Sequence, residues 1–476
     1  MADDARGLLR VAIVGGGITG LAAAHEALTR ARELGRPVTV TVLERATRLG
    51  GHLMTERSGG FVLDAGADSW VAAKPHASAL AREVGLEGSI IGTREGTRRY
   101  FVAWQDRLHA VPEGLVLGVP TRVMPLLRTP LFSPLGKLRM MLEPLVPARR
   151  FEGDDDESIA DFAVRRLGHE AADRLVAPLL GGISAGDASD LSVRAAFPQF
   201  IAMEREHGSL VRGTLAAQRA RAGTAPHGVG EGAFRSLDGG IEALAIAVAE
   251  HVRRSGAILR IATGVEAIVR AGGTWHVDLE GGERMVADAV ILAVPASAAA
   301  CLVRGTDVGA ASALEAIRFG STATVFLGYR RPDVAHPLDG VGFVVPRSLG
   351  RPILAGTWVS SKWPGRAPEG HVLLRAFFSL SQGPERTDDE LVRLARDELR
   401  ALMGLDASPV LTRVFRFDHA SPQMRVGHLV HLRELKERLS RVAPGLRLAG
   451  GGYEGIGIPD SVRQGREAAR AVVESH

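Results

Sequence analysis

The strongest pattern of apolar and polar positions lies at the start of the chain. Four apolar residues at 11–14 lead into a run of three glycines, and a pattern typical of a helix follows over 21–34. A second apolar run at 38–43 has the length of a buried strand. Strand, helix and strand in this order predict a βαβ unit with two parallel strands.

The glycines between the first strand and the helix predict a dinucleotide-binding turn. Gly15 permits the tight turn, Gly17 lets backbone amides approach a pyrophosphate at the helix N-terminus, and Gly20 allows close packing of helix against strand. Glu44 ends the second strand, where a carboxylate can accept hydrogen bonds from a ribose. The whole unit therefore predicts a bound dinucleotide.

The segment after the second strand favours a flavin over a nicotinamide. Arg45, Arg48, Gly50 and Gly51 belong to an E-R-x-x-R-L-G-G run, which fits a second approach to the pyrophosphate. The alternative is a solvated basic turn. Residues 61–66 (F-V-L-D-A-G) then predict a short strand and a turn.

Later patterns indicate an interleaved rather than a serial organisation. Residues 236–248 combine a glycine turn with helical spacing, residues 258–269 contain a β-like run, and residues 288–295 have the pattern of a buried strand. Residues 446–465 predict a strand, a glycine loop and a helix that begins near Pro459, with the positive end of its dipole at the loop. These runs also suit the core of any α/β domain, and the loop also suits a simple sharp turn.

Composition excludes several classes of protein. The chain of 476 residues is 46% hydrophobic and 24% charged, which is ordinary for two or three globular domains. Its net charge of +4 is small, so we do not infer nucleic-acid binding. Cys301 is the only cysteine, which excludes an intramolecular disulfide and an all-cysteine metal site, and we expect no metal.

The expected location is the cytoplasm. The first ten residues are polar and acidic and run directly into the first strand, which leaves no room for a cleavable signal. No apolar run reaches the roughly 18 residues of a spanning helix.

Taken together, these motifs resemble the flavin-dependent amine oxidase and desaturase superfamily, and within it the protoporphyrinogen oxidase family. The narrower likeness is carried by R-L-H-A-V-P at 107–112, the A-G-D-x-x-x-L-S run within 180–198, M-E-R-E-H-G-S-L at 203–210 and the glycine run at 452–465. It spans residues 11–471. One departure lies at 415–428, where Phe417 and Met424 stand in place of the family's usual tryptophan and I-P-Q-Y run.

The resemblance implies an α/β fold of mixed α+β character with three interleaved domains. A Rossmann-like FAD-binding domain would comprise residues 1–90, 233–300 and 440–476. A β-sheet substrate domain would comprise residues 301–439, and a helical domain residues 91–232.

The motifs and the resemblance together yield a set of site residues. The residues expected to bind FAD are Gly15, Gly17, Gly20, Glu44, Arg45, Arg48, Gly50, Gly51, Gly66, Val265, Gly452, Gly457, Ile458 and Pro459. The resemblance implies that Arg99 meets a propionate of a tetrapyrrole, that Gly182 lets the backbone approach it, and that Val344, Trp358 and Phe378 line its pocket. No catalytic acid or base is assigned, and we interpret His207 as a structural helix residue.

The implied activity is the six-electron oxidation of protoporphyrinogen IX to protoporphyrin IX, by three hydride transfers to the flavin with molecular oxygen as acceptor. Coproporphyrinogen III is the alternative substrate. More distant alternatives are an amine oxidase, a carotenoid desaturase or a non-catalytic flavin-binding protein. A homodimer is the expected assembly.

Residues 107–150 mix apolar runs with seven basic and two acidic residues. They resemble the membrane-binding portion of the family, and such a mixture suits an anionic bilayer surface. The alternative is an ordinary helical subdomain packed on the core.

Overall fold

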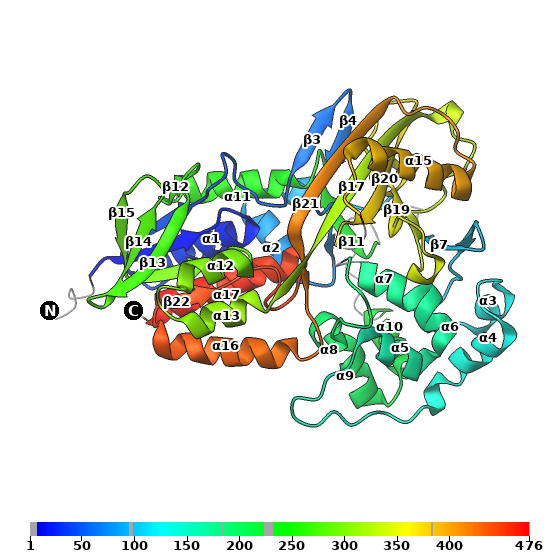
Figure 1. Ribbon diagram of the computed structural model, residues 1–476, viewed down its shortest axis with the longest axis horizontal. Helices are drawn as coiled ribbons and strands as arrows, with labels where there is room; N and C mark the ends of the chain where they lie inside the picture. Colours follow the sequence, from blue (N-terminus) through cyan, green and yellow to red (C-terminus); the bar gives the residue numbers. More distant parts are fainter. Residues whose placement is uncertain (1–6, 95–98, 183–184, 223–231, 382–383, 476) are drawn as a thin grey trace.

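The computed structural model describes all residues except 1–6, 95–98, 183–184, 223–231, 382–383 and 476. We divide it into a parallel-sheet part, an antiparallel-sheet part and a helical part (Figure 1). The long strands β17 (Arg318–Arg330) and β21 (Leu411–Gln423) run from the first of these into the second.

The parallel-sheet part draws its strands from distant stretches of the chain. Its five-stranded sheet has the order β12 (Ile258–Arg260), β2 (Val38–Leu43), β1 (Leu9–Val14), β16 (Ala289–Leu292) and β22 (Leu446–Leu448), and every pair is parallel. The structure confirms the predicted βαβ unit, with α1 (Ile18–Glu33) between β1 and β2. It also confirms a strand within 288–295 and a helix that begins near Pro459.

Two hydrophobic layers cover this sheet. One face packs against α1, α2 (Pro75–Glu83), α11 (Glu242–Arg254) and α17 (Ile458–Ser475). The other face packs against a small sheet and three helices, which are β13 (Val265–Ala271), β14 (Thr274–Leu279), β15 (Arg284–Ala287), α12 (Ala296–Val303), α13 (Val308–Glu315) and α16 (His428–Val442). The sheet strands are apolar on both sides because both faces are buried.

The antiparallel-sheet part has seven strands. Their order is β21, β17, β20 (His371–Ser379), β19 (Ala355–Trp358), β18 (Gly342–Val344), β7 (Phe101–Trp104) and β8 (Arg107–Ala110), and only the β18 and β7 pair is parallel. Helix α15 (Asp388–Met403) covers one face, and a capping box of Thr387 and Glu390 sets its start. Strands β7 and β8 therefore join this sheet, although the sequence led us to place residues 91–232 together in a helical domain.

Short helices make up the helical part. They are α3 (Val123–Arg128), α4 (Pro134–Met141), α5 (Ile159–Leu167), α6 (His169–Ala171), α7 (Ala177–Gly182), α8 (Val193–Ala196), α9 (Pro198–His207) and α10 (Leu210–Ala222), with a π-helical turn at Ala172–Val176. Arg166 is fully buried at its centre and pairs with Glu143 and Glu204. A buried charge is tolerated only when it is paired in this way.

Small elements connect these parts. They are the hairpin of β3 (Thr55–Ser58) and β4 (Phe61–Asp64), the three-stranded sheet of β5 (Trp70–Val71), β11 (Phe234–Leu237) and β6 (Ile90–Gly92), the pair β9 (Leu115–Val116) and β10 (Val119–Pro120), and α14 (Val359–Lys362). Within the described residues, no helix is long and apolar enough to cross a bilayer.

Candidate flavin and substrate site

The turn between β1 and α1 is shaped by close backbone packing. A Cβ atom on Gly20 would lie 1.9 Å from the carbonyl oxygen of Gly15, and one on Gly15 would lie 2.4 Å from that of Ala293. Beside Gly17, by contrast, the nearest atom to a Cβ would be 3.9 Å away. The turn is therefore closed on its inner side and leaves room at the N-terminus of α1, where an anion is favoured.

The carboxylate of Glu44 lies at this turn. One of its oxygens accepts a hydrogen bond from the backbone N–H of Gly16 at 2.7 Å, and the other accepts one from Ala46 at 2.8 Å. Thr263, two residues before the predicted contact Val265, donates its N–H to the carbonyl of Glu44 at 2.8 Å. The structure thus brings Glu44 and the start of β13 together, as a nucleoside site requires.

A second glycine pair lies against the first. The N–H of Gly50 donates to the carbonyl of Gly16 at 2.8 Å, and a Cβ on Gly51 would lie 3.2 Å from the Cα of Gly17. Arg48 holds this loop by donating to the carbonyl of Leu49 at 3.1 Å, whereas the exposed Arg45 pairs with Glu280 at 2.9 Å. The two glycine runs therefore form one backbone-lined surface, and its arginines lie at the edge.

The turn after β4 lies where the parallel-sheet part meets the seven-stranded sheet. A Cβ on Gly66 would lie 2.3 Å from the carbonyl oxygen of His52. Arg375 of β20 donates to the carbonyls of Ala65 and Gly66 at 2.6 and 2.7 Å. The ring of His52 meets the ring of Phe417 edge to face at 5.7 Å. Segments distant in sequence therefore converge around Gly66.

The C-terminal glycine loop closes the same region. Gly452 lies against the two long strands. A Cβ atom on Gly452 would lie 2.9 Å from Pro422 of β21 and 3.0 Å from Phe319 of β17. The loop ends at Gly457, and α17 follows with Ile458 and Pro459 in its first turn. An 18-residue helix therefore directs the positive end of its dipole at this loop, as predicted.

The register of the seven-stranded sheet decides which side chains face this region. Phe377 is opposite Thr324 on β17 and Ala355 on β19, and Ala355 is in turn opposite Val344. Successive side chains of a strand point to opposite faces, so these four share the face that carries Arg375. Val344 packs against the helical part and is half-buried.

The predicted pocket residues Trp358 and Phe378 lie on the other face. Both are fully buried in the core between the sheet and α15, and Trp358 packs against Phe101 at 5.2 Å between ring centroids. The prediction that they line the substrate pocket is therefore wrong. The physical reason is that side chains alternate between the two faces of a strand. A shift of one residue along β20, from Phe378 to Phe377, therefore moves the side chain to the opposite face of the sheet.

The remaining predicted substrate residues lie at the edges of this face. Arg99 is more than half exposed and pairs with Asp339 at 2.5 Å. Gly182 ends α7, and no atom lies within 4 Å of the position of a Cβ there. Arg347, just beyond β18, donates to the carbonyls of Ala185 and Gly186 at 3.1 and 2.9 Å, which places it beside the end of α7.

Sequence reasoning missed a buried charged cluster behind Gly66. Asp68 accepts hydrogen bonds from Lys362 at 2.9 Å and from the indole of Trp363 at 3.0 Å. Burial opposes its ionisation, but the charges of Lys362 and Arg375 outweigh burial and hold the pKa of Asp68 well below its usual range. The signal was present in the run V-L-L-R-A-F-F of β20, where one arginine interrupts an apolar strand.

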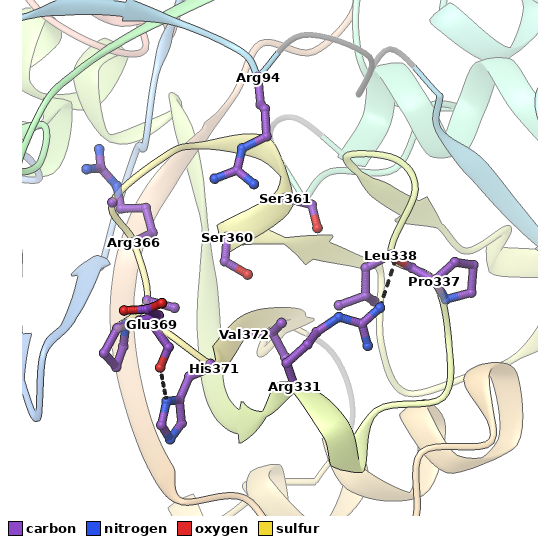
Figure 2. Close-up of a pocket in the computed structure, with 14 residues that line it drawn as sticks. Arg94, Arg331, Pro337, Leu338, Ser360, Ser361, Arg366, Glu369, His371 and Val372 are labelled. Atoms are coloured by element: carbon purple, nitrogen blue, oxygen red, sulfur yellow. Dashed lines mark hydrogen bonds between the residues drawn. The ribbon is translucent and has the colours of Figure 1, made fainter.

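A separate cavity of about 430 Å³ lies at the ends of β17 and β20 (Figure 2). Arg94 points into it beside Ser360, whereas Arg331 turns aside to the carbonyl of Pro337 at 3.3 Å. The guanidinium of Arg366 points away from the cavity and lies 3.1 Å from Asp64. None of the predicted site residues lines this cavity, so it is separate from the candidate flavin site.

The fold and site together define the class of protein. Three features fit FAD: the βαβ glycine turn, the carboxylate at the end of β2, and the sheet face that converges on Gly66. In addition, there is open space at Gly17, and the Nε of Arg375 beside Gly66 is a buried donor without a hydrogen-bond partner. The protein is an FAD-dependent oxidoreductase. When bound, FAD supplies the two-electron redox chemistry, and the chain binds and orients it.

Comparison with known proteins identifies the family. A model described as flavin containing amine oxidoreductase matches residues 18–473. Coproporphyrinogen III oxidase of Bacillus subtilis is 34% identical over 468 residues, which cover 97% of each chain. Chloroplastic protoporphyrinogen oxidase of Nicotiana tabacum is 28% identical, over 97% of this chain and 84% of the tobacco chain. The chain belongs to the flavin containing amine oxidoreductase family.

A solved structure supports the same assignment. The crystal structure of a candidate protoporphyrinogen oxidase from Exiguobacterium sp. 255-15 has a TM-score of 0.85 and 30% sequence identity. The match covers 98% of this chain and 99% of that one, so the interleaved architecture is shared throughout.

Proposed function

We propose that the protein oxidises a porphyrinogen to the corresponding porphyrin with bound FAD. The relatives described above are named as porphyrinogen oxidases, and they align with this chain over nearly its whole length. FAD would run from Glu44 at the ribose, past Gly17 and Gly51 at the pyrophosphate, to the isoalloxazine beside Gly66. The glycine loop before α17 would lie at the pyrimidine end of the ring.

The macrocycle would lie between the sheet face and the helical part. Val344 and Phe377 offer an apolar wall, and α7, which packs against β18, ends at Gly182 with no atom within 4 Å of the position of a Cβ. A flat, largely apolar substrate suits such walls, and its carboxylates suit guanidinium partners at the edges. The apolar wall of Val344 and Phe377 next to the helical part is the observation that carries the proposal.

Coproporphyrinogen III is the substrate we favour, in place of the sequence-based preference for protoporphyrinogen IX. The coproporphyrinogen oxidase of Bacillus subtilis is 34% identical to this chain and the tobacco protoporphyrinogen oxidase 28%. Arg99 precedes β7 beside the start of β18, and Arg347 follows β18, so a cation lies near each end of this strand pair. Coproporphyrinogen carries propionates on both sides of the ring, whereas protoporphyrinogen carries them on one side.

The proposed reaction removes six electrons and six protons from each porphyrinogen. Three rounds each remove a hydride and a proton, and each round is completed when molecular oxygen accepts two electrons and two protons to give hydrogen peroxide. One porphyrinogen and three oxygen molecules therefore give one porphyrin and three peroxides. The chain's part is to hold the macrocycle flat against the flavin and to exclude water from it.

Aerobic turnover tests this proposal. Purified protein would be mixed with coproporphyrinogen III or protoporphyrinogen IX, and porphyrin fluorescence, oxygen uptake and peroxide would be followed together. The proposal predicts three oxygen molecules consumed for each porphyrin formed and a higher kcat/KM for coproporphyrinogen. Bound FAD without porphyrin formation above the rate of the enzyme-free solution would refute it.

We also propose that the helical part attaches to an anionic membrane surface. Large apolar side chains are exposed along α3 and α4 and just after them, including Val123 at 57%, Met124 at 58%, Leu135 at 78% and Leu145 at 73%. Arginines and a lysine, Arg122, Arg128 and Lys137, lie among them. Exposed apolar side chains next to cations favour anionic headgroups.

Vesicle sedimentation tests the attachment. Binding to phosphatidylglycerol vesicles is expected to exceed binding to phosphatidylcholine vesicles, and the double variant Leu135→Glu, Leu145→Glu is expected to remain in the supernatant. The exposed pair Val308→Glu, Val410→Glu, far from α4 in sequence, is the matched control. Equal sedimentation of both double variants would contradict the proposal.

A further inference from the structure

Arg375 is a charged side chain in the middle of an apolar strand. It is only 5% exposed, and its guanidinium lies over the rings of Phe377 at 4.4 Å and Phe326 at 5.0 Å. One terminal nitrogen donates to the carbonyls of Ala65 and Gly66, while Nε is buried without a hydrogen-bond partner. Burial lowers the pKa of Arg375 to about 10, so the group stays charged at neutral pH.

The carboxylates near Arg375 are already engaged by other cations. Asp68 lies 2.9 Å from Lys362, and Asp64 lies 3.1 Å from Arg366 and accepts a hydrogen bond from Thr55 at 2.7 Å. With two carboxylates and three cations in the cluster, one positive charge remains. Of these three cations, Arg375 is the one that donates to the carbonyl of Gly66, so it is the charge placed at this turn.

An excess buried charge is costly unless something compensates it. The neighbours of Arg375 on the same face, Phe377 and Thr324, show that an apolar or neutral side chain fits this face. The turn itself needs only a hydrogen-bond donor to its carbonyls, which a neutral amide also supplies. The guanidinium is therefore suited to a ligand that is negatively charged during part of the reaction.

We propose that Arg375 stabilises the negative charge that the isoalloxazine acquires on two-electron reduction, and so raises the reduction potential of the bound flavin. The proposal rests on the placement of the isoalloxazine beside Gly66 in the proposed function. Two-electron reduction with uptake of one proton leaves one negative charge on the ring. A fixed cation in a site of low dielectric constant favours that state over the neutral oxidised ring.

The reduction potential of the purified FAD-bound protein tests the proposal without any substrate. In equilibrium titrations against a redox dye at pH 7.5, Arg375→Gln is expected to lower the equilibrium constant for reduction at least tenfold. For a two-electron couple this corresponds to about 30 mV. Arg375→Lys keeps the charge and is expected to stay within threefold of the wild type.

Asp68→Asn provides a test with the opposite sign. Removal of the carboxylate leaves Lys362 and Arg375 less compensated, so the equilibrium constant for reduction is expected to rise at least threefold. A merely structural role of the cluster does not predict opposite shifts from the two variants. Arg330→Gln, the same substitution at an arginine that is 65% exposed and paired with Asp333, is the matched control and is expected to leave the potential unchanged.

Two outcomes would overturn the inference: an unchanged potential in Arg375→Gln, or shifts of the same sign in Arg375→Gln and Asp68→Asn. If Arg375→Gln does not retain FAD, the comparison of Asp68→Asn with the wild type decides. The proposal is then refuted if the equilibrium constant for reduction does not rise in Asp68→Asn. Failure of the proposed function is distinguishable, because it would appear as absent porphyrinogen oxidation whatever the potentials of these variants.

Discussion

The two ends of the proposed flavin site are built from different groups. At the N-terminus of α1 the surface is backbone, and Gly15, Gly20 and Gly51 permit the close contacts there. Around Gly66 the surface is made by side chains from distant strands, with the charge of Arg375 buried against aromatic rings and that of Asp68 partly buried. The difference teaches that one end is suited to holding the cofactor and the other to adjusting its reactivity.

The sharpest test of the backbone-built end is Gly20→Val. The new Cβ would lie 1.9 Å from the carbonyl oxygen of Gly15, so the turn cannot keep its shape. We expect FAD binding at least 100-fold weaker and a loss of about 3 kcal/mol or more in the free energy of unfolding. Flavin retained after gel filtration and chemical denaturation measure the two effects.

Gly7→Val is the matched control, because no atom lies within 4 Å of the position of its Cβ. It is expected to retain FAD like the wild type. Full FAD occupancy in Gly20→Val would mean that the close contact does not determine the turn.

Adjacent aromatic residues on β20 test the side-chain-built end. Phe378→Ala should cost about 3–5 kcal/mol in unfolding free energy, since it empties a fully buried core site, but should leave kcat/KM of the folded enzyme nearly unchanged. Phe377→Ala should cost less stability and raise KM about tenfold, because its side chain faces the proposed substrate position. Urea denaturation and steady-state kinetics separate the two effects, and the opposite pattern would show that the faces of β20 are reversed.

Substitution of Arg347 tests the substrate preference. Loss of a charge-assisted hydrogen bond costs about 1.5–3 kcal/mol, so Arg347→Gln should lower kcat/KM for coproporphyrinogen by about 10- to 100-fold. The value for protoporphyrinogen should stay within about threefold, since one side of that ring carries no propionate. Arg304→Gln, an exposed arginine paired with Glu315, is the control. Equal losses for both substrates would contradict the assigned role.

A smaller effect concerns the pH dependence of stability. The pKa of Asp68 is held below its usual range in the folded protein by Lys362 and Arg375, against the effect of burial. A depressed carboxyl pKa stabilises the fold above the unfolded pKa of about 4, and this stabilisation decreases as pH falls through the folded value. The advantage of the wild type over Asp68→Asn should therefore be constant above about pH 5 and shrink as pH falls below about 4 in urea titrations. A difference that stays constant in the acid range would contradict the charge assignment.

The backbone-built end could be predicted from the sequence because its signals are local. The run from β1 through Gly20 to Glu44 contains both strands and the helix within 40 residues, and the structure confirms each element. The glycine loop before α17 is equally local, since its strand and helix flank it directly. In both segments the spacing of the apolar residues and the turn residues favour the same strands, loops and helices that the structure has.

The side-chain-built end depends on contacts that are not local. The run V-L-L-R-A-F-F of β20 is almost continuously apolar, so nothing in it shows which aromatic residue faces the site. The pairing of β18 with β7 joins residues about 240 positions apart, which the apolar pattern of neither strand could reveal. Arg375 was missed for the same reason: its partners Ala65 and Gly66 are more than 300 residues away.

Anaerobic mixing of the FAD-bound protein with a porphyrinogen tests the central claim most directly. Bleaching of the visible flavin band would be followed by stopped flow, separately with coproporphyrinogen III and protoporphyrinogen IX. We predict rapid bleaching with both and a faster, tighter reaction with coproporphyrinogen. If FAD is bound and neither porphyrinogen bleaches it, the protein is not a porphyrinogen oxidase.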